Sequence, residues 1–239
     1  MALAWALVAV LVAGIAWAEE LDEDPWERLN RKVFWFNDKA DVYFFEPLAK
    51  GWSFLLPDLA MESIGHAVDN ARLPIHLLNA LLQGKAREGF DTVSRFILNS
   101  TLGAGGLFDP AGRIGLAPQR EDFGQTLGVW GYRNSAYLVL PLLGPSTVRD
   151  TAGLAVDSPS AVWPFFVSLP VSLTYRGGTA VNSRALVLDE LESAKRGALD
   201  YYALIRNAYL QHRAAKIANM EPTEEEDDDE EDLYYLDEQ

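Results

Sequence analysis

The chain has 239 residues, of which 20 are Lys or Arg and 35 are Asp or Glu, giving a formal net charge of −15. Because 12 of these acids lie in the last 19 residues, which hold no Lys or Arg, the rest of the chain carries a net charge of only −3. A nearly neutral body without a basic stripe argues against nucleic-acid binding, which depends on Lys and Arg contacts to phosphate. The sequence holds no Cys, which excludes disulfides, thiolate metal sites, a Cys nucleophile and a lipid attached through a Cys thiol.

The N-terminal residues 1–18 have the features of an export signal. Residues 2–18 form an uncharged apolar run, and Ala16-Trp17-Ala18 fits the small-x-small pattern of a cleavage site. No Lys or Arg precedes the run, so a retained N-terminal anchor is the alternative to a cleaved signal peptide. Both interpretations predict that the following domain, residues 19–220, lies outside the cytoplasm. Nine consecutive acids at residues 224–232 predict a disordered acidic tail over residues 221–239.

Helical patterns dominate the domain. Asp24-Pro25-Trp26-Glu27 predicts a helix start with Asp24 as the N-cap, and Glu46-Pro47 predicts its end. Apolar residues recur between these points at spacings of three and four, with further aromatic residues off the stripe, so this helix is expected to be buried or lipid-facing. Further helices are expected at residues 58–69, 74–82, 85–98, 182–195 and 198–218, without a convincing run of strands. The predicted fold class is all-α.

The centre of the chain differs from the rest. Eight glycines from Gly103 to Gly131 predict loops and tight turns rather than a continuous helix. Two uncharged segments, residues 134–148 and 158–175, are interrupted by prolines and cannot be straight membrane helices. They suit short amphipathic helices in a membrane interface, and equally the buried core of a helical protein.

No arrangement of residue types predicts catalysis or cofactor binding. His66, His76 and His212 lack metal-ligand spacing and are interpreted as ordinary surface or core residues. The chain has no G-x-S-x-G nucleophile elbow, and Gly103-Ala104-Gly105-Gly106 lacks the rest of a dinucleotide or phosphate-loop signature. We therefore expect neither an enzyme nor a metal or cofactor site.

A series of motifs nevertheless occurs in a recognisable order. They are Asp24-Pro25, Asn30-Arg31, Phe36-Asn37, Leu82-Gln83-Gly84 and residues 95–103, 105–111, 121–128, 137–141 and 144–150. Together they resemble the MlaA/VacJ family of outer-membrane phospholipid-transport proteins, over about residues 24–216. Any one of these motifs is weak, but their number and order make the resemblance specific.

The resemblance implies a compact, ring-like helical bundle with interfacial amphipathic helices and a glycine-rich central hairpin. It implies a protein in the inner leaflet of the outer membrane, on the periplasmic face, that maintains lipid asymmetry. Outer-leaflet phospholipids would pass through a narrow amphipathic passage to a periplasmic lipid-carrier protein. The resemblance also implies binding to a trimeric porin and no hydrolytic activity.

Individual residues follow from the resemblance. The mobile hairpin beside the passage matches residues 123–137, from Phe123 to Tyr137, in which Gly124, Gly128 and Gly131 would either supply bending or make static turns. A possible polar pair, Arg149 and Asp150, would be either structural or a contact for a lipid headgroup.

The sequence also departs from the family pattern in two places. His66-Ala67 stands where the family has an Asn-Phe pair, which puts a gating role for this segment in doubt. Ala18-Glu19 stands where the family usually has a lipidated Cys, so the anchor would be the apolar segments, a retained signal helix or a protein partner. The alternative function is therefore a soluble periplasmic interaction protein of the same fold without membrane insertion.

Overall fold

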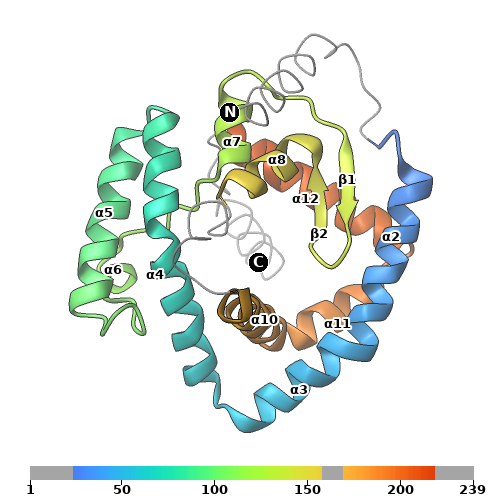
Figure 1. The fold of residues 1–239 in the computed structure, drawn as a ribbon, viewed down its shortest axis with the longest axis horizontal. Coiled ribbons are helices and arrows are strands. Elements are labelled where there is room, and N and C mark those ends of the chain that lie inside the picture. The colour runs from blue at the N-terminus through green and yellow to red at the C-terminus, as the bar shows by residue number, and fades with distance from the viewer. Residues whose placement is uncertain (1–23, 158–168, 219–239) are drawn as a thin grey trace, which may run out of the picture.

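The computed structural model describes residues 24–157 and 169–218, which form helices and one two-stranded hairpin (Figure 1). In chain order the elements are α2 (Glu27–Ala40), the π-helix η1 (Asp41–Phe45), α3 (Glu46–Leu55), α4 (Asp58–Leu82), α5 (Ala86–Thr101), α6 (Pro110–Arg113), α7 (Phe123–Val129), β1 (Tyr137–Leu140), β2 (Gly144–Thr147), α8 (Val148–Asp157), α10 (Leu169–Leu186), α11 (Leu188–Gly197) and α12 (Tyr201–Ala218). The predicted signal peptide or anchor at residues 1–18, the acidic tail at 221–239 and most of the uncharged segment 158–175 lie outside the described residues. The all-α class is confirmed, since each strand has only four residues.

The elements follow a closed circuit rather than stacking in layers. In Figure 1, α2, α3 and α4 follow one another from the right side of the view, round its lower edge, to the left side, with α5 packed outside α4 and α6 against α5. The circuit closes because α4 contacts α7, α7 packs against α8, α8 contacts β2, and β1 contacts α2. Helix α10 packs against α3 and α4, and α12 packs against α7 and β2.

The predicted first helix starts and ends differently from expectation. Trp26, not Asp24, is the N-cap, and the buried Asp24 carboxylate instead accepts hydrogen bonds from Asn30 Nδ2, at 2.7 Å, and from the Tyr202 hydroxyl. The predicted end at Glu46-Pro47 is wrong because the helix continues through the π-turn of η1 into α3. Pro47 lies in the first turn of α3, where a missing N–H and a fixed φ are compatible with a helix.

Residues 58–69 and 74–82 are one helix rather than two. α4 runs unbroken from Asp58 to Leu82 with Pro74 inside it. An internal proline costs a helix about 3 kcal/mol, and here α5 and α10 both pack along α4, so tertiary burial offsets that cost. The local rule failed because it could not take account of these neighbours.

Uncharged residues 134–148 contain a β-hairpin rather than interfacial helices. β1 and β2 pair antiparallel, with Tyr137 opposite Thr147 and Leu140 opposite Gly144. Two asparagine side chains of α2 hold β1: Asn30 Nδ2 donates to the Tyr137 carbonyl at 3.1 Å and Asn30 Oδ1 accepts from the Val139 amide at 3.0 Å. Asn37 likewise bonds the Leu140 carbonyl at 2.9 Å and the Leu142 amide at 2.8 Å. Side-chain amides thus replace a neighbouring strand.

The interior is unusually polar. Small apolar clusters lie between α3, α4 and α10 around Met61, and between α2, β1 and α12 around Tyr137 and Tyr202. Among the described residues, however, the buried polar and charged side chains outnumber the buried apolar ones. The largest fully buried side chains are Tyr137, Gln125, Asn30, Asn79, Asn182, Thr92, Thr126 and Thr147. Hydrogen bonding therefore carries much of the internal packing.

Candidate functional site

The residues assigned by resemblance to a passage hairpin do not form a hairpin. Phe123, Gly124 and Gly128 belong to α7, a helix capped by the Asp122 carboxylate, which accepts from the Gln125 amide at 2.9 Å. Gly131 follows the helix in a turn. Tyr137 begins β1 and is fully buried in the cluster with Tyr202, where burial and the nearby Asp24 carboxylate raise its pKa to about 12. The hairpin expected at residues 123–137 is thus a helix, a turn and an extended connection to β1.

Two of these glycines permit close packing rather than bending. A Cβ at Gly124 would lie 2.5 Å from Asp150 Oδ1, and a Cβ at Gly128 would lie 2.9 Å from the Ile217 side chain. On the facing helix α8, a Cβ at Gly153 would lie 2.3 Å from the Gly124 backbone nitrogen. Gly131 alone among the three predicted glycines has a left-handed φ, of 115°, with open space around it. The sequence signal for glycine did not distinguish these two uses.

Arg149 and Asp150 lie in a buried charge network between α7, α8 and α12. Arg149 Nη2 is 2.9 Å from Asp150 Oδ1, and the two side chains are 3% and 7% exposed. Arg213 of α12 bridges two carboxylates, with Nη2 2.7 Å from Asp150 Oδ1 and Nη1 2.5 Å from Asp122 Oδ2. The Tyr209 hydroxyl donates to Asp150 Oδ2 at 2.8 Å. This geometry favours a structural role for the pair over contact with a lipid headgroup.

The network keeps its carboxylates ionised. Burial alone would raise the pKa of Asp122, but its hydrogen bonds and charge pairing with Arg213 outweigh burial and hold that pKa at about 2. Burial likewise opposes ionisation of Asp150, and the Arg213 and Arg149 guanidinium groups lower its pKa. In contrast, burial raises the pKa of Asp157, which accepts from the Phe123 amide at 2.6 Å and from Asn79.

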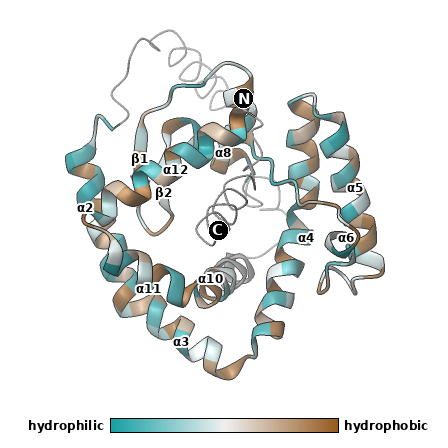
Figure 2. Cartoon of the chain, turned by 180° about the vertical axis from the view of Figure 1, so that it is seen from behind, coloured by the Kyte–Doolittle hydropathy of each residue, from teal (hydrophilic) through white to brown (hydrophobic). Residues whose placement is uncertain are grey.

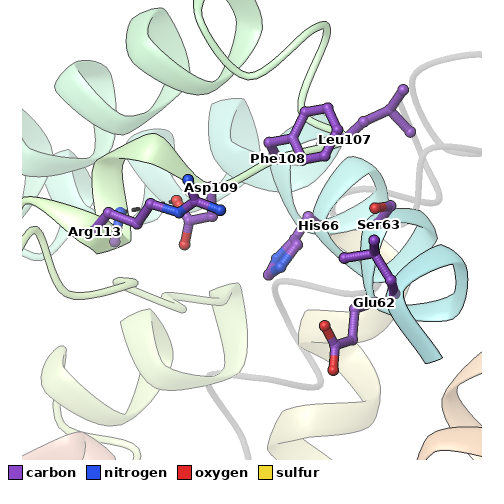
Figure 3. Close-up of a pocket in the computed structure, with 9 residues that line it drawn as sticks. Glu62, Ser63, His66, Leu107, Phe108, Asp109 and Arg113 are labelled. Atoms are coloured by element: carbon purple, nitrogen blue, oxygen red, sulfur yellow. Dashed lines mark hydrogen bonds between the residues drawn. The ribbon is translucent and has the colours of Figure 1, made fainter.

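A cleft lies between α4 and the α6 region, on the side of α4 that faces away from the charge network. Its outer cavity has a volume of about 350 Å³ and lies between α4 and the α5–α6 region. Figure 3 shows Glu62, Ser63 and His66 on the α4 side, Asp109 and Arg113 on the α6 side, and Leu107 and Phe108 along one edge. A second, inner cavity of about 300 Å³ shares Glu62, His66 and Asp109 with the first and extends along α4 to His76. We call the two together the α4–α6 cleft.

The wall of the cleft is held by ion pairs. Asp109 caps α6 by accepting from the Gly112 amide at 3.0 Å and receives Arg95 Nη2 at 2.8 Å. Burial works against the ionised form, but the Gly112 amide and Arg95 keep the pKa of Asp109 below its usual value. Asp69 and Arg120 pair at 2.7 Å. These four charged side chains are therefore already paired within the protein. Glu62 and Arg113, in contrast, form no side-chain hydrogen bond or ion pair with any described residue.

Large apolar side chains lie on the outside. Figure 2 shows hydrophobic positions recurring along α2, α3, α4 and α5, the outer helices of the circuit. Phe54, Leu55 and Leu59, around the α3–α4 junction, are 88%, 73% and 68% exposed. A soluble monomer rarely exposes so many large apolar residues together. We call the exposed apolar residues of α2, η1, α3, α4 and α5 the apolar rim.

Within residues 24–157 and 169–218, no group of three or more His, Asp or Glu side chains could hold a metal ion. In this part of the chain there is also no helix with the length and apolarity needed to span a membrane.

Comparison with known proteins decides the family. The sequence profile of the MlaA lipoprotein family matches residues 22–216. The chain belongs to the MlaA family. It is 33% identical over 194 residues to the intermembrane phospholipid transport system lipoprotein MlaA of Escherichia coli, covering 79% of this chain and 76% of that one. The MlaA of Haemophilus influenzae is 32% identical over 199 residues, with 81% and 79% covered.

Two further similarities agree. An uncharacterized protein of Rickettsia bellii is 36% identical over 196 residues, covering 81% of this chain and 76% of that one. A solved structure from work on the structural basis for maintenance of bacterial outer membrane lipid asymmetry superimposes with a TM-score of 0.71 at 32% identity. It covers 82% of this chain and 100% of the other. The fold of this MlaA-family chain is therefore shared with a protein studied for lipid asymmetry.

Sequence reasoning missed several residues of this MlaA-family chain. Arg213 and Asp122 are 91 positions apart, and Arg213 and Asp150 are 63 apart, so no local pattern links them. Glu62 and Arg113 of the cleft carry no motif either. His66 was interpreted as an ordinary residue, and the structure places it on the cleft wall. For Asp122 and Asp150, the sequence signal was their place in the family motifs 121–128 and 144–150.

Proposed function

We propose that this protein transports phospholipid in the bacterial envelope and so maintains outer-membrane lipid asymmetry. In this proposal it lies in the inner leaflet of the outer membrane, on the periplasmic face. It passes outer-leaflet phospholipid through an amphipathic passage to a periplasmic carrier, in association with a trimeric porin. It binds and moves lipid without converting it chemically. Membership of the MlaA family and the names of the MlaA relatives support this proposal.

The observation that carries the membrane placement is the reversed distribution of polarity. The apolar rim holds residues such as Phe54 and Leu55, while the interior is filled with asparagine, threonine and ion pairs. Burying one large apolar side chain contributes about 1.5–3 kcal/mol. Transfer of the apolar rim from water into the hydrocarbon of a membrane is therefore favourable.

The polar interior gives the proposed passage its chemical logic. A phospholipid headgroup carries charges whose transfer into hydrocarbon without partners costs several kcal/mol or more. A protein that lies in the leaflet with polar groups turned inward lowers this cost. The Lys85–Glu121 pair at 2.8 Å, with both side chains under a tenth exposed, illustrates how the interior between α4 and α7 tolerates charge.

The alternative, a soluble periplasmic interaction protein, predicts a surface compatible with water. The apolar rim argues against it. The two functions also differ in where the protein is found: a membrane protein is recovered in the outer-membrane pellet after a salt wash, and a soluble one in the periplasmic extract.

The decisive experiment measures phospholipid exposed on the cell surface in a strain that lacks the protein. We expect more surface phospholipid than in the parent strain, and a return to the parental level when the chain is re-expressed. An unchanged surface with an intact outer-membrane barrier would contradict the transport proposal.

A rim variant tests the placement separately. Replacing Phe54, Leu55 and Leu59 by Ser removes at least about 3 kcal/mol of apolar transfer free energy, which corresponds to about 100-fold in partition. The share of protein in the washed membrane pellet should fall. As a matched control, Asp189→Ser with Glu190→Ser changes the exposed surface of α11 without removing apolar area and should leave that share unchanged. Equal pelleting of all three proteins would argue that the rim does not hold the protein in the membrane.

A further inference from the structure

We propose that the α4–α6 cleft binds the headgroup of a zwitterionic phospholipid, with the phosphodiester on Arg113 and the ammonium group on Glu62. This inference rests on the proposed function and names the lipid class that such a protein would recognise. The two cavities of about 350 and 300 Å³ are within the size range of small-molecule sites.

Two opposite charges without partners are the first reason. The other charged side chains of the cleft are already paired, Asp109 with Arg95 and Asp69 with Arg120. Arg113 and Glu62 have no side-chain partner among the described residues, although both line the outer cavity, from its two sides (Figure 3). A guanidinium fork matches a phosphodiester, and a carboxylate matches a primary ammonium. A zwitterion satisfies both at once, whereas a simple anion at Arg113 would face the Glu62 carboxylate.

The apolar edge is the second reason. Leu107 and Phe108 line the outer cavity beside these charges and remain exposed (Figure 3). Leu59, from the apolar rim, lines the same cavity. The cleft thus runs from charged groups to an apolar surface, which fits a headgroup that continues into acyl chains better than it fits a small soluble ion.

The third reason lies in the inner cavity. Asn70 and Arg95 are each only 6% exposed and line this cavity, yet Asn70 Oδ1 and Arg95 Nε have no hydrogen-bond partner among the described residues. Buried polar atoms are nearly always hydrogen-bonded. A lipid that reaches inward from the outer cavity can donate an ammonium N–H to Asn70 Oδ1. It can also offer an ester or phosphate oxygen as the acceptor for Arg95 Nε–H.

The test measures binding of dihexanoyl phosphatidylethanolamine to the full-length protein in detergent micelles. Three comparison ligands separate the chemistry: dihexanoyl phosphatidylglycerol lacks the ammonium, glycerophosphoethanolamine lacks the acyl chains, and inorganic phosphate lacks both. We expect the ethanolamine lipid to bind about tenfold tighter than the glycerol lipid, since only the former meets Glu62. Glycerophosphoethanolamine and inorganic phosphate should bind more weakly than either lipid.

Substitutions assign the two charges. Arg113→Gln should weaken both lipids about tenfold or more, because both lose the guanidinium. Glu62→Gln should weaken only the ethanolamine lipid, down to the affinity of the glycerol lipid. Arg113→Lys keeps the charge without the fork and should fall between wild type and Arg113→Gln. The matched controls Arg87→Gln and Glu190→Gln, exposed charges away from the cleft, should bind as wild type does.

Several outcomes would overturn the inference. One is unchanged lipid binding in Arg113→Gln and Glu62→Gln at unchanged melting temperature. Another is inorganic phosphate or glycerophosphoethanolamine binding as tightly as the lipid, which would show a site for a soluble anion or a soluble phosphodiester. The same variants are expressed in the strain that lacks the protein. Normal surface phospholipid in cells that carry Arg113→Gln would refute lipid binding at the α4–α6 cleft and leave the proposed function standing. A deletion strain without excess surface phospholipid would refute the proposed function. In that case, the binding measurements alone test whether the cleft binds lipid.

Discussion

Replacing Arg213 by Met should destabilise the protein through the charge network. The Arg213 side chain is 9% exposed and contacts both Asp122 and Asp150 at 2.5–2.7 Å. Removing one partner of a buried ion pair costs about 3–5 kcal/mol. Because the Asp122 side chain is 37% exposed and partly screened by water, the lower end, about 3 kcal/mol, is expected. For a chain of this size, that lowers the melting temperature by about 6–12 °C.

The assay is thermal unfolding of the full-length protein, followed by circular dichroism under fixed detergent and salt. Arg31→Met is the matched control: Arg31 also contacts two carboxylates, Glu27 and Asp200, at 2.7 Å, but all three side chains are more than 40% exposed. Exposed pairs contribute about 1 kcal/mol or less, so its melting temperature should fall by less than about 4 °C.

A double variant tests the cause. In Arg213→Met the buried Asp150 carboxylate keeps only one of its two guanidinium partners, Arg149. Adding Asp150→Asn removes that carboxylate charge, while Arg149 keeps its hydrogen bonds to the Tyr132 and Arg133 carbonyls. The double variant should therefore lose less stability than the sum of the two single variants, by about 1–2 kcal/mol. Additive losses, or an Arg213→Met effect no larger than that of Arg31→Met, would refute the reasoning.

Four further outcomes are expected. Because the pKa of Asp122 is lowered to about 2, its pairing stabilises the fold above about pH 4, and this stabilisation is lost as the pH falls towards 2. The free energy of unfolding of the wild type, measured at a series of acid pH values, should therefore fall by about 1–2 kcal/mol over that window through this group, after a discount for its exposure. Gly153→Ala should cost about 3 kcal/mol, measured by thermal unfolding, because its Cβ would meet backbone at 2.3 Å. Gly131→Val should lower the free energy of unfolding by about 1–3 kcal/mol, because its left-handed φ strains the backbone of a β-branched residue. A change in surface phospholipid at normal protein level would show that this segment gates transport. Lower abundance alone would show that Gly131 makes a static turn. Deleting residues 224–239 should leave melting temperature and surface phospholipid unchanged, and an outer-membrane barrier defect at normal protein level would contradict this.

The sequence by itself determined the helical class and the family. Apolar residues at spacings of three and four are a local property, and they located α5 and α12 to within a few residues. The single helix expected at residues 182–195 is instead the end of α10 followed, after Val187, by α11. The ordered motifs between residues 24 and 216 coincide with the match to the MlaA family at residues 22–216. Local glycine and proline rules were less reliable. Pro47 is compatible with a helix because it lies in the first turn of α3, and Pro74 lies inside α4 because α5 and α10 pack along that helix.

Only the tertiary structure decided what the polar residues do. Asn30 and Asn37 stood out as family motifs, but their partners in the β1 hairpin lie more than 100 positions away along the chain. Gly124 was expected either to bend a hairpin or to make a static turn, and its use in close packing depends on Asp150 and Gly153 of a different helix. Arg113 and Glu62 become a pair of free charges only where α6 folds back towards α4. Periodicity records which face of a helix avoids water, whereas a hydrogen bond or ion pair requires the position of a second group, and that position exists only in the folded chain.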